Sequence, residues 1–183
     1  MANYLTLKRQ TIDIQLHYRL RCRVPQSAKL YGLPKLHKPN ILMRPIVSFC
    51  GSPTYQLSKH LTNILKPLTD KSRHKLQSTD NFINAIKSVQ IPDDHKHVSS
   101  DVNSLFTSIP LQLAPDCTET AINKSHYQPP LPTDDLMDLL HLCLTSTYFQ
   151  YNGKHYNQLH GTAMGLFPLF PVSCYLFPLL WLK

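Results

Sequence analysis

Three cationic side chains lie close together in a stretch that three prolines keep from being helical. The stretch is KLYGLPKLHKPNILMRPIVS, residues 29–48, and the cations are Lys35, Lys38 and Arg44. Because proline lacks a backbone N–H and fixes φ, we expect an extended hairpin here. A lysine acting as a point charge and an arginine acting as a planar fork would suit the phosphates of a triphosphate. The alternative interpretation is an exposed basic loop without a ligand.

A single carboxylate, Asp101, stands in the segment HVSSDVNSLFTSIP, where residues 97–106 otherwise predict a buried strand leading into a turn at Pro110. Asp101 could accept hydrogen bonds from backbone amides, or cap the turn that follows. It could also bind Mg²⁺ beside the backbone carbonyl of Val102, because hard cations take oxygen ligands. In that case Phe106 would form the floor of a pocket for a sugar.

A third candidate is the glycine-flanked sequence QLHGTAMG. Gln158 supplies an amide, Gly161 and Gly165 permit close backbone approach, and Met164 adapts its shape to an apolar surface. These properties suit packing against a nucleotide or a base pair. A simple turn that opens a helix explains the glycines equally well.

Two further polar clusters have simpler interpretations. The sequence DDHKH (93–97) follows Pro92 and is typical of a loop, with metal binding as the alternative. The sequence TDDLMD (133–138) is typical of an acidic helix start, which the helix dipole favours. No Ser/His/Asp or Cys/His set has a spacing that indicates a nucleophile.

In the first half of the chain, the elements that would position these residues are a strand and two helices. Ile46 and Val47 predict a short strand, while Ser52 as N-cap and Pro53 as first helical residue predict the start of a helix. A second helix is expected at about 80–90, ending before Pro92. The apolar residues expected to be buried on these helices are Leu57, Leu61, Ile64, Leu65, Leu68, Phe82, Ile83, Ile86 and Val89.

The second half predicts two more helices and a hairpin. The helices are expected at about 112–125 and 133–146, the latter capped by Thr133, and Asn152–Gly153 between two aromatic-rich arms indicates a tight hairpin. Without a regular βαβ order, the fold class is expected to be α+β. The apolar residues expected to be buried here are Leu113, Cys117, Ala121, Ile122, Leu136, Leu139, Leu140, Cys143 and Leu144.

Charge is divided unevenly over the 183 residues, a length that suits one domain or two sub-lobes sharing a core. Residues 1–75 carry 14 Lys and Arg and 2 Asp, a net charge of +12, whereas residues 76–183 carry 5 Lys and 9 Asp or Glu, a net charge of −4. This division indicates a lobe that meets phosphates joined to a more acidic one. A basic, soluble surface without a partner is the alternative.

The cysteines indicate the redox environment of the protein, and the apolar carboxyl-terminal segment raises the question of a membrane span. Five scattered cysteines form neither a zinc-ligand pattern nor a disulfide framework, so we expect reduced, intracellular thiols. The apolar segment near the carboxyl end is about long enough to span a membrane, but Pro168, Pro171 and Pro178 interrupt it. No membrane association is therefore expected.

Taken in order, the motifs YGLPKLHKPN…MRPIVS, GSPTYQLSKHLTNILKPL, SSDVNSLFTSIP, YFQYNGKHYNQ and GTAMG resemble the reverse transcriptase domain of Penelope-like retroelements. The similarity runs from about Lys29 to Gly165, roughly three quarters of the chain. It implies the fingers and part of the palm of a right-hand reverse transcriptase, an α+β fold. The expected divisions are a basic N-terminal segment, a fingers-like basic lobe, a partial palm and a divergent apolar tail, at 1–28, 29–95, 96–165 and 166–183.

The resemblance implies a role for each of the cations and for the lone carboxylate. Lys35 and Arg44, with Lys38 as a helper, match fingers residues that contact the phosphates of the incoming nucleotide. Asp101 matches the first palm aspartate, a catalytic ligand of both Mg²⁺ ions, and Val102 matches the residue that offers them its carbonyl oxygen.

The resemblance also implies how the sugar and base are held. Phe106 matches the aromatic position that senses the 2′ side of the sugar. Gln158, Gly161, Met164 and Gly165 match the palm motif that packs on the nucleotide and the template.

The sequence departs from the family's pattern after Gly165. The family has a Ser-Pro…Ser-Pro run that begins a helix, whereas this chain reads GLFPLFPVSCYLF, with phenylalanines where serines are expected. The family's second catalytic motif, a hairpin with an Asp-Asp pair, has no counterpart, because Asp138 is the last acidic residue. Two-metal transfer needs several carboxylates, so we expect the catalytic site of these residues to be incomplete.

The function expected from the resemblance is that of a fragment of an RNA-directed DNA polymerase. In the intact family a primer 3′-hydroxyl attacks the α-phosphate of a deoxynucleotide triphosphate, with RNA as template, DNA as primer and two Mg²⁺ ions. The expected location is intracellular, and nuclear by resemblance. Two alternatives stay open: a non-catalytic remnant that binds RNA or DNA through its basic lobe, and a decayed gene product without a selected role.

Overall fold

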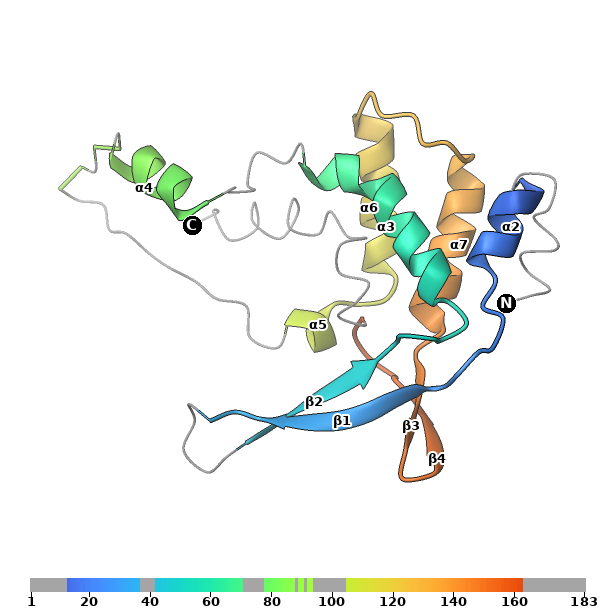
Figure 1. Cartoon of the computed structure of the whole chain (residues 1–183). Helices are drawn as coiled ribbons and strands as arrows, with labels where there is room; N and C mark the ends of the chain where they lie inside the picture. Colours follow the sequence, from blue (N-terminus) through green and yellow to red (C-terminus); the bar gives the residue numbers. More distant parts are fainter. Residues whose placement is uncertain are drawn as a thin grey trace.

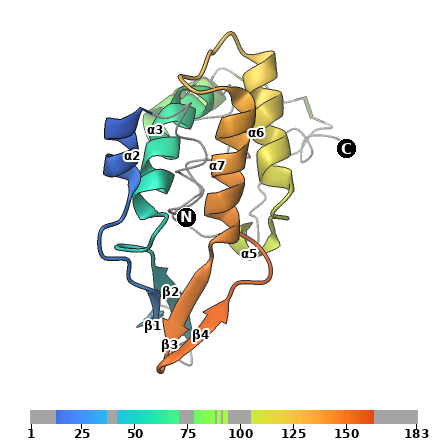
Figure 2. The same ribbon diagram turned by 90° about the vertical axis from the view of Figure 1, so that its right-hand side faces the viewer.

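Helices and one small sheet make up this computed structural model, which describes residues 13–36, 42–70, 78–87, 89–90, 92–93 and 105–162. Figure 1 shows the sheet at one end of a group of helices, and Figure 2 shows α3, α6 and α7 side by side above it. The mixed content confirms the α+β class. In chain order the elements are α2 (Ile14–Leu20), β1 (Ala28–Pro34), β2 (Met43–Ser48), α3 (Tyr55–Asp70), α4 (Thr79–Lys87), α5 (Leu105–Ser108), α6 (Leu113–Lys124), α7 (Thr133–Thr145), β3 (Tyr148–Tyr151) and β4 (Lys154–Asn157).

The sheet joins two hairpins that are far apart in the sequence. Its strand order is β2-β1-β3-β4. Strand β1 pairs with β2 in antiparallel fashion, from Lys29 opposite Ser48 to Pro34 opposite Met43. Strand β1 also pairs with β3 in parallel fashion, with Lys29 beside Gln150. The first hairpin is therefore attached to the second through one short parallel contact.

Two predicted β features are confirmed. Ile46 and Val47 lie in β2, as the sequence indicated. Asn152 and Gly153 form the two-residue loop between β3 and β4, and both have positive φ, at 48° and 74°. Positive φ at both loop residues is the geometry that matches the twist of two antiparallel strands, which explains why Asn-Gly occupies these positions.

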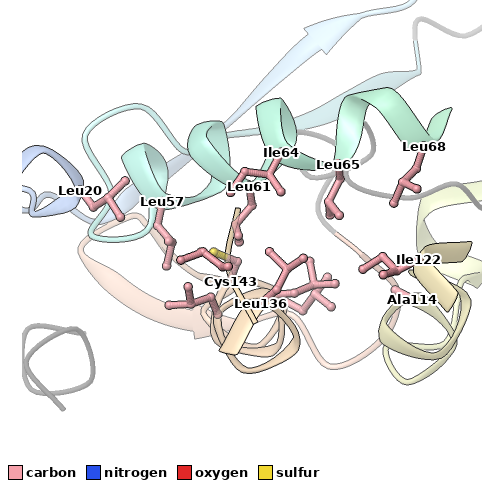
Figure 3. Close-up of a cluster of buried hydrophobic side chains, with 14 residues drawn as sticks. Leu20, Leu57, Leu61, Ile64, Leu65, Leu68, Ala114, Ile122, Leu136 and Cys143 are labelled. Carbon is pink, nitrogen blue, oxygen red and sulfur yellow. The ribbon is translucent and has the colours of Figure 1, made fainter. Parts of the chain in front are cut away.

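The hydrophobic core lies between α3, α6 and α7. Leu57, Leu61 and Leu65 are fully buried on α3 and point toward α7, as Figure 3 shows. The predicted buried faces of α3 and α7 are both confirmed. Leu20 of α2, a helix that the sequence did not predict, also joins this core. Residues from the amino-terminal and carboxyl-terminal parts of the described chain thus share one core.

The predicted helix caps are wrong at two positions. Helix α3 begins at Tyr55, and the Ser52 hydroxyl is buried without a hydrogen-bond partner among the described residues. The Tyr55 N–H instead donates to the Ser52 backbone oxygen at 3.2 Å, so a backbone turn starts the helix. In α7, Thr133 is already helical because the extended Pro132 takes the N-cap position and makes no side-chain cap bond.

The predicted burial of α4 is also wrong. The helix itself is confirmed, but Phe82, Ile83, Ile86 and the following Val89 are all exposed, by 38% or more. A 3.6-residue period shows that a helix is amphipathic, but it does not say whether another element covers the apolar side.

Helix α6 is turned slightly from the predicted orientation. Cys117 and Ile122 are buried as expected, but Leu113 and Ala121 are half-buried, while Ala114 and Thr118 are fully buried. The Thr118 hydroxyl donates to the Ala114 backbone oxygen at 2.8 Å, which satisfies this polar group inside the core.

The strand predicted over 97–106 is wrong at its end, because Leu105 and Phe106 belong to the short helix α5. The preceding residues, 97–104, lie outside the described part of the chain. Ile109, just after α5, is buried. Among the described helices, none combines the length and the apolar character needed to cross a membrane.

Candidate nucleotide and nucleic-acid site

The β1–β2 hairpin places Lys35 and Arg44 on the same face. Arg44 lies opposite Leu33, and the Lys35 N–H donates to the Leu42 backbone oxygen at 2.8 Å, which continues the ladder by one pair. Because side chains alternate between faces, Leu33, Lys35 and Arg44 point to the same side, with the two cations as diagonal neighbours. Diagonal neighbours are about 7–8 Å apart at the backbone, within reach of one triphosphate for side chains of this length.

Two residues, Pro45 and Gly32, fit their positions in this hairpin for local reasons. Pro45 lies on β2, which is an edge strand, and an edge strand tolerates a residue without a backbone N–H. Gly32 lies close to the Met43 side chain, so that a Cβ at position 32 would meet Met43 Cε at 2.7 Å. The local sequence thus permits close packing on one face while the cations occupy the other.

We call the face that carries Lys29, Lys35 and Arg44 the basic face. Lys29 shares it because alternate residues of β1 point the same way. Tyr31 lies on it between the two lysines and is 48% exposed. The basic face therefore combines cations with an exposed aromatic ring, as in many surfaces that bind nucleic acid.

The sequence around the basic face contains no counter-charge. Between Asp13 and Asp70 there are nine Lys and Arg residues and not one Asp or Glu. Arg44 and Lys29 are exposed, and Lys35 is half-buried. Such a concentration of positive charge attracts polyanions and raises their local concentration. Lys38, the third predicted cation, lies outside the described residues.

The turn after β4 contains two further predicted residues. Gln158 is half-buried, its N–H donates to the Thr147 backbone oxygen at 3.4 Å, and its side-chain amide donates to the His160 backbone oxygen at 2.8 Å. Gly161 is buried with φ of 77°, a conformation that favours glycine. Gly161 therefore has a structural role in a sharp turn. Met164 and Gly165 lie outside the described residues.

The predicted metal ligands lie in a part of the chain that the structure does not describe. Asp101 and Val102 lie outside the described residues, and Phe106 is described only as part of the α5 backbone. Within the described ranges, no group of three or more His, Cys, Asp or Glu side chains could hold a metal ion. Mg²⁺ binding by Asp101 stays a prediction from the sequence.

The sheet links the basic face to the Gln158–Gly161 turn, but at opposite ends of β1. Strand β3 pairs with the beginning of β1, at Ala28 and Lys29, whereas Lys35 follows its end. In Figure 1 the far end of the β1–β2 hairpin points away from β3 and β4. The described residues therefore bring Lys35 and Arg44 together and leave Gln158 and Gly161 at a separate place.

One polar contact across the sheet was not predicted from the sequence. The Ser27 hydroxyl lies 3.2 Å from His155 Nε2, which connects the segment before β1 with β4. Both side chains lie on the side of the sheet that carries Lys29, because Lys29 is paired with Gln150 and Gln150 is opposite His155. Only the parallel β1–β3 pairing brings these residues together, and no local sequence signal indicates such a pairing.

No protein-family model, no curated protein and no solved structure matches this chain.

Proposed function

We propose that this chain is part of an RNA-directed DNA polymerase domain in which the basic face holds the phosphates of a nucleotide and of nucleic acid. The observation that carries the proposal is the register of the β1–β2 hairpin, which puts Lys35 and Arg44 on one face. The motifs of the resemblance add support, since they assign the same two residues to the incoming nucleotide.

The chemistry of the two cations fits this task. Arg44 can donate two parallel hydrogen bonds to phosphate oxygens, and Lys35 can approach a neighbouring phosphate as a compact charge. Asp101 is the one carboxylate that the resemblance assigns to Mg²⁺. When bound, such ions would stabilise the charge that develops on a transferred phosphoryl group. We expect these 183 residues by themselves to bind without polymerising, because one carboxylate does not hold two ions.

A second candidate function is binding of RNA or DNA without catalysis. The absence of any acidic residue between Asp13 and Asp70 favours it, because phosphate binding requires only the positive surface. For these 183 residues the two candidates predict the same binding behaviour, and only a positive primer-extension result would separate them. Extension in Mg²⁺ that disappears in Asp101→Ala would support the polymerase and contradict our expectation of an incomplete site.

The test is fluorescence anisotropy with a labelled RNA–DNA hybrid over a series of salt concentrations. We expect the double variant Lys35→Ala/Arg44→Ala to bind more weakly, with a log–log salt slope smaller by about 1.5–2 because two phosphate contacts are lost. Lys59→Ala, an exposed lysine on α3, is the control and should leave affinity close to that of the unchanged protein. An unchanged slope in the double variant, or an equal loss in the control, would refute a specific role for the basic face.

A further inference from the structure

The second hairpin carries an aromatic surface on the side of the sheet opposite to the basic face. Phe149 lies opposite Tyr156, and Tyr151 lies opposite Lys154. Because Phe149 and Tyr151 are two residues apart on β3, all four side chains point to one side. Gln150, between them, is paired with Lys29 and points to the other side, with the basic face. We call this second surface the aromatic face.

The aromatic face contains one stacked pair of rings, and its tyrosines are accessible. Phe149 and Tyr156 stack with ring centroids 5.7 Å apart and an interplanar angle of 20°. Tyr156 is nevertheless 45% exposed, and Tyr151 is 54% exposed. A cross-strand aromatic pair stabilises a hairpin, which accounts for the contact between Phe149 and Tyr156. It does not account for Tyr151, whose direct partner is a lysine, or for the open side of Tyr156.

The charge around these rings indicates the chemistry of a partner that could bind them. Lys154 is exposed beside Tyr151, and the four strands of the sheet contain no Asp or Glu. After Asp138, the chain has no acidic residue at all. A positive, acid-free surface with exposed tyrosine rings complements a polyanion whose flat groups can stack. Unpaired nucleic acid is such a partner, because each base offers a π-face and each linkage a negative charge.

We propose that the aromatic face binds an unpaired strand of RNA or DNA, with bases stacked on Tyr151 and Tyr156 and a phosphate at Lys154. Sheets that bind single strands in this way stack two or three bases on aromatic residues of neighbouring strands. The inference rests on the proposed function in that the partner is nucleic acid, but it uses a different surface and a different interaction. The basic face would hold phosphates, and the aromatic face would hold bases.

The test measures the anisotropy of short labelled oligo(dT) and oligo(U) strands. We expect Tyr151→Val/Tyr156→Val to weaken binding of both about fivefold or more, because each stacked base contributes to affinity. We expect Tyr151→Phe/Tyr156→Phe to retain affinity within about twofold, since phenylalanine keeps the ring. Neither change removes a charge, so the salt slope should stay the same. Tyr18→Leu, at an exposed tyrosine on α2, is the control.

A second measurement keeps the test independent of whether the valine variant folds. In the unchanged protein, 2-aminopurine placed in the strand should lose fluorescence on binding, since stacking quenches it. Absence of quenching in a bound strand contradicts the proposal, as does an unchanged affinity of a folded valine variant. If the valine variant instead dissociates a dimer in sedimentation while affinity stays constant, the aromatic face contacts a second copy and the proposal is wrong.

Failure of this inference and failure of the proposed function give different results. If Lys35→Ala/Arg44→Ala weakens binding and the valine variant does not, the stacking inference alone is refuted. If the unchanged protein binds neither the hybrid nor the single strands, both proposals are refuted.

Discussion

At the scale of single residues, strand register decides what Lys35 and Arg44 can do. The sequence predicted that they lie close together on a hairpin, and the alternation along β1 and β2 puts them on one face. A shift of one residue in the pairing would separate them onto opposite faces, because side chains alternate with a period of two. The prediction of proximity could be made from proline positions, but the shared face depends on a register that the loop sequence does not specify.

His60 on α3 provides a residue-scale prediction about pH. Burial lowers the pKa of His60 below its ordinary value of 6.5, and the nearby Arg19 lowers it further. Unfolded His60 therefore takes up a proton more readily than folded His60, so its contribution to stability is present above about pH 6.5 and is lost as pH falls through the folded pKa. We expect His60→Gln to reduce the acid-dependent fall in the free energy of unfolding, measured by urea denaturation at a series of pH values between about 7 and 5.

His126→Gln is the matched control, because His126 is exposed in the loop after α6. A pH profile of His60→Gln that follows the unchanged protein at every pH would show that His60 contributes nothing to this dependence.

At the scale of elements, the sequence predicted those features that depend only on residues near one another in the chain. The apolar period of GSPTYQLSKHLTNILKPL predicted the buried face of α3, and Asn152–Gly153 predicted the β3–β4 loop. The exposure of Phe82 on α4 and the pairing of β1 with β3 could not be predicted in this way. Both depend on which distant element comes close, and neither helix period nor strand propensity contains that information.

Gly153 provides an element-scale prediction. A Cβ at this position would meet no atom within 4 Å, yet φ is 74°, so Gly153→Ala changes the backbone preference without a steric clash. We expect a loss of about 1–2 kcal/mol in the free energy of unfolding, since residues with a Cβ disfavour left-handed backbone conformations. Urea denaturation followed by circular dichroism measures it.

Gly32→Ala is the comparison for this variant. Its Cβ would meet the Met43 side chain, closely at Cε, the flexible end, and at an ordinary contact distance at Cβ. Alanine in a strand also costs less backbone entropy than glycine. We expect a smaller loss of stability than for Gly153→Ala. The reverse order would contradict the assignment of positive φ as the cause.

At the scale of the whole molecule, four of the described helices, α2, α3, α6 and α7, share one core. The core joins Leu20 and α3 from the basic part of the sequence to α6 and α7 from the acidic part. The Tyr127 hydroxyl adds a link by donating to the Ile64 backbone oxygen at 2.7 Å. The uneven charge along the sequence therefore does not correspond to two separate cores among the described residues. The boundaries drawn at residues 28, 95 and 165 stay predictions.

This arrangement predicts that core and surface substitutions separate stability from binding. Leu140 is fully buried on α7, and Leu140→Ala should lower the free energy of unfolding by about 2–5 kcal/mol, because it removes apolar contacts and leaves a cavity. Phe82, 46% exposed on α4, is the comparison, and Phe82→Ala should change stability by only about 0.5 kcal/mol. Urea denaturation gives both values.

Binding of the RNA–DNA hybrid by the same two variants is then measured without urea, at a temperature at which each variant is folded. Under those conditions both should bind like the unchanged protein, because neither residue lies on the basic face or the aromatic face. Equal stability losses would mean that α4 is covered in solution after all, and weaker binding by folded Phe82→Ala would assign the apolar side of α4 to the nucleic-acid surface.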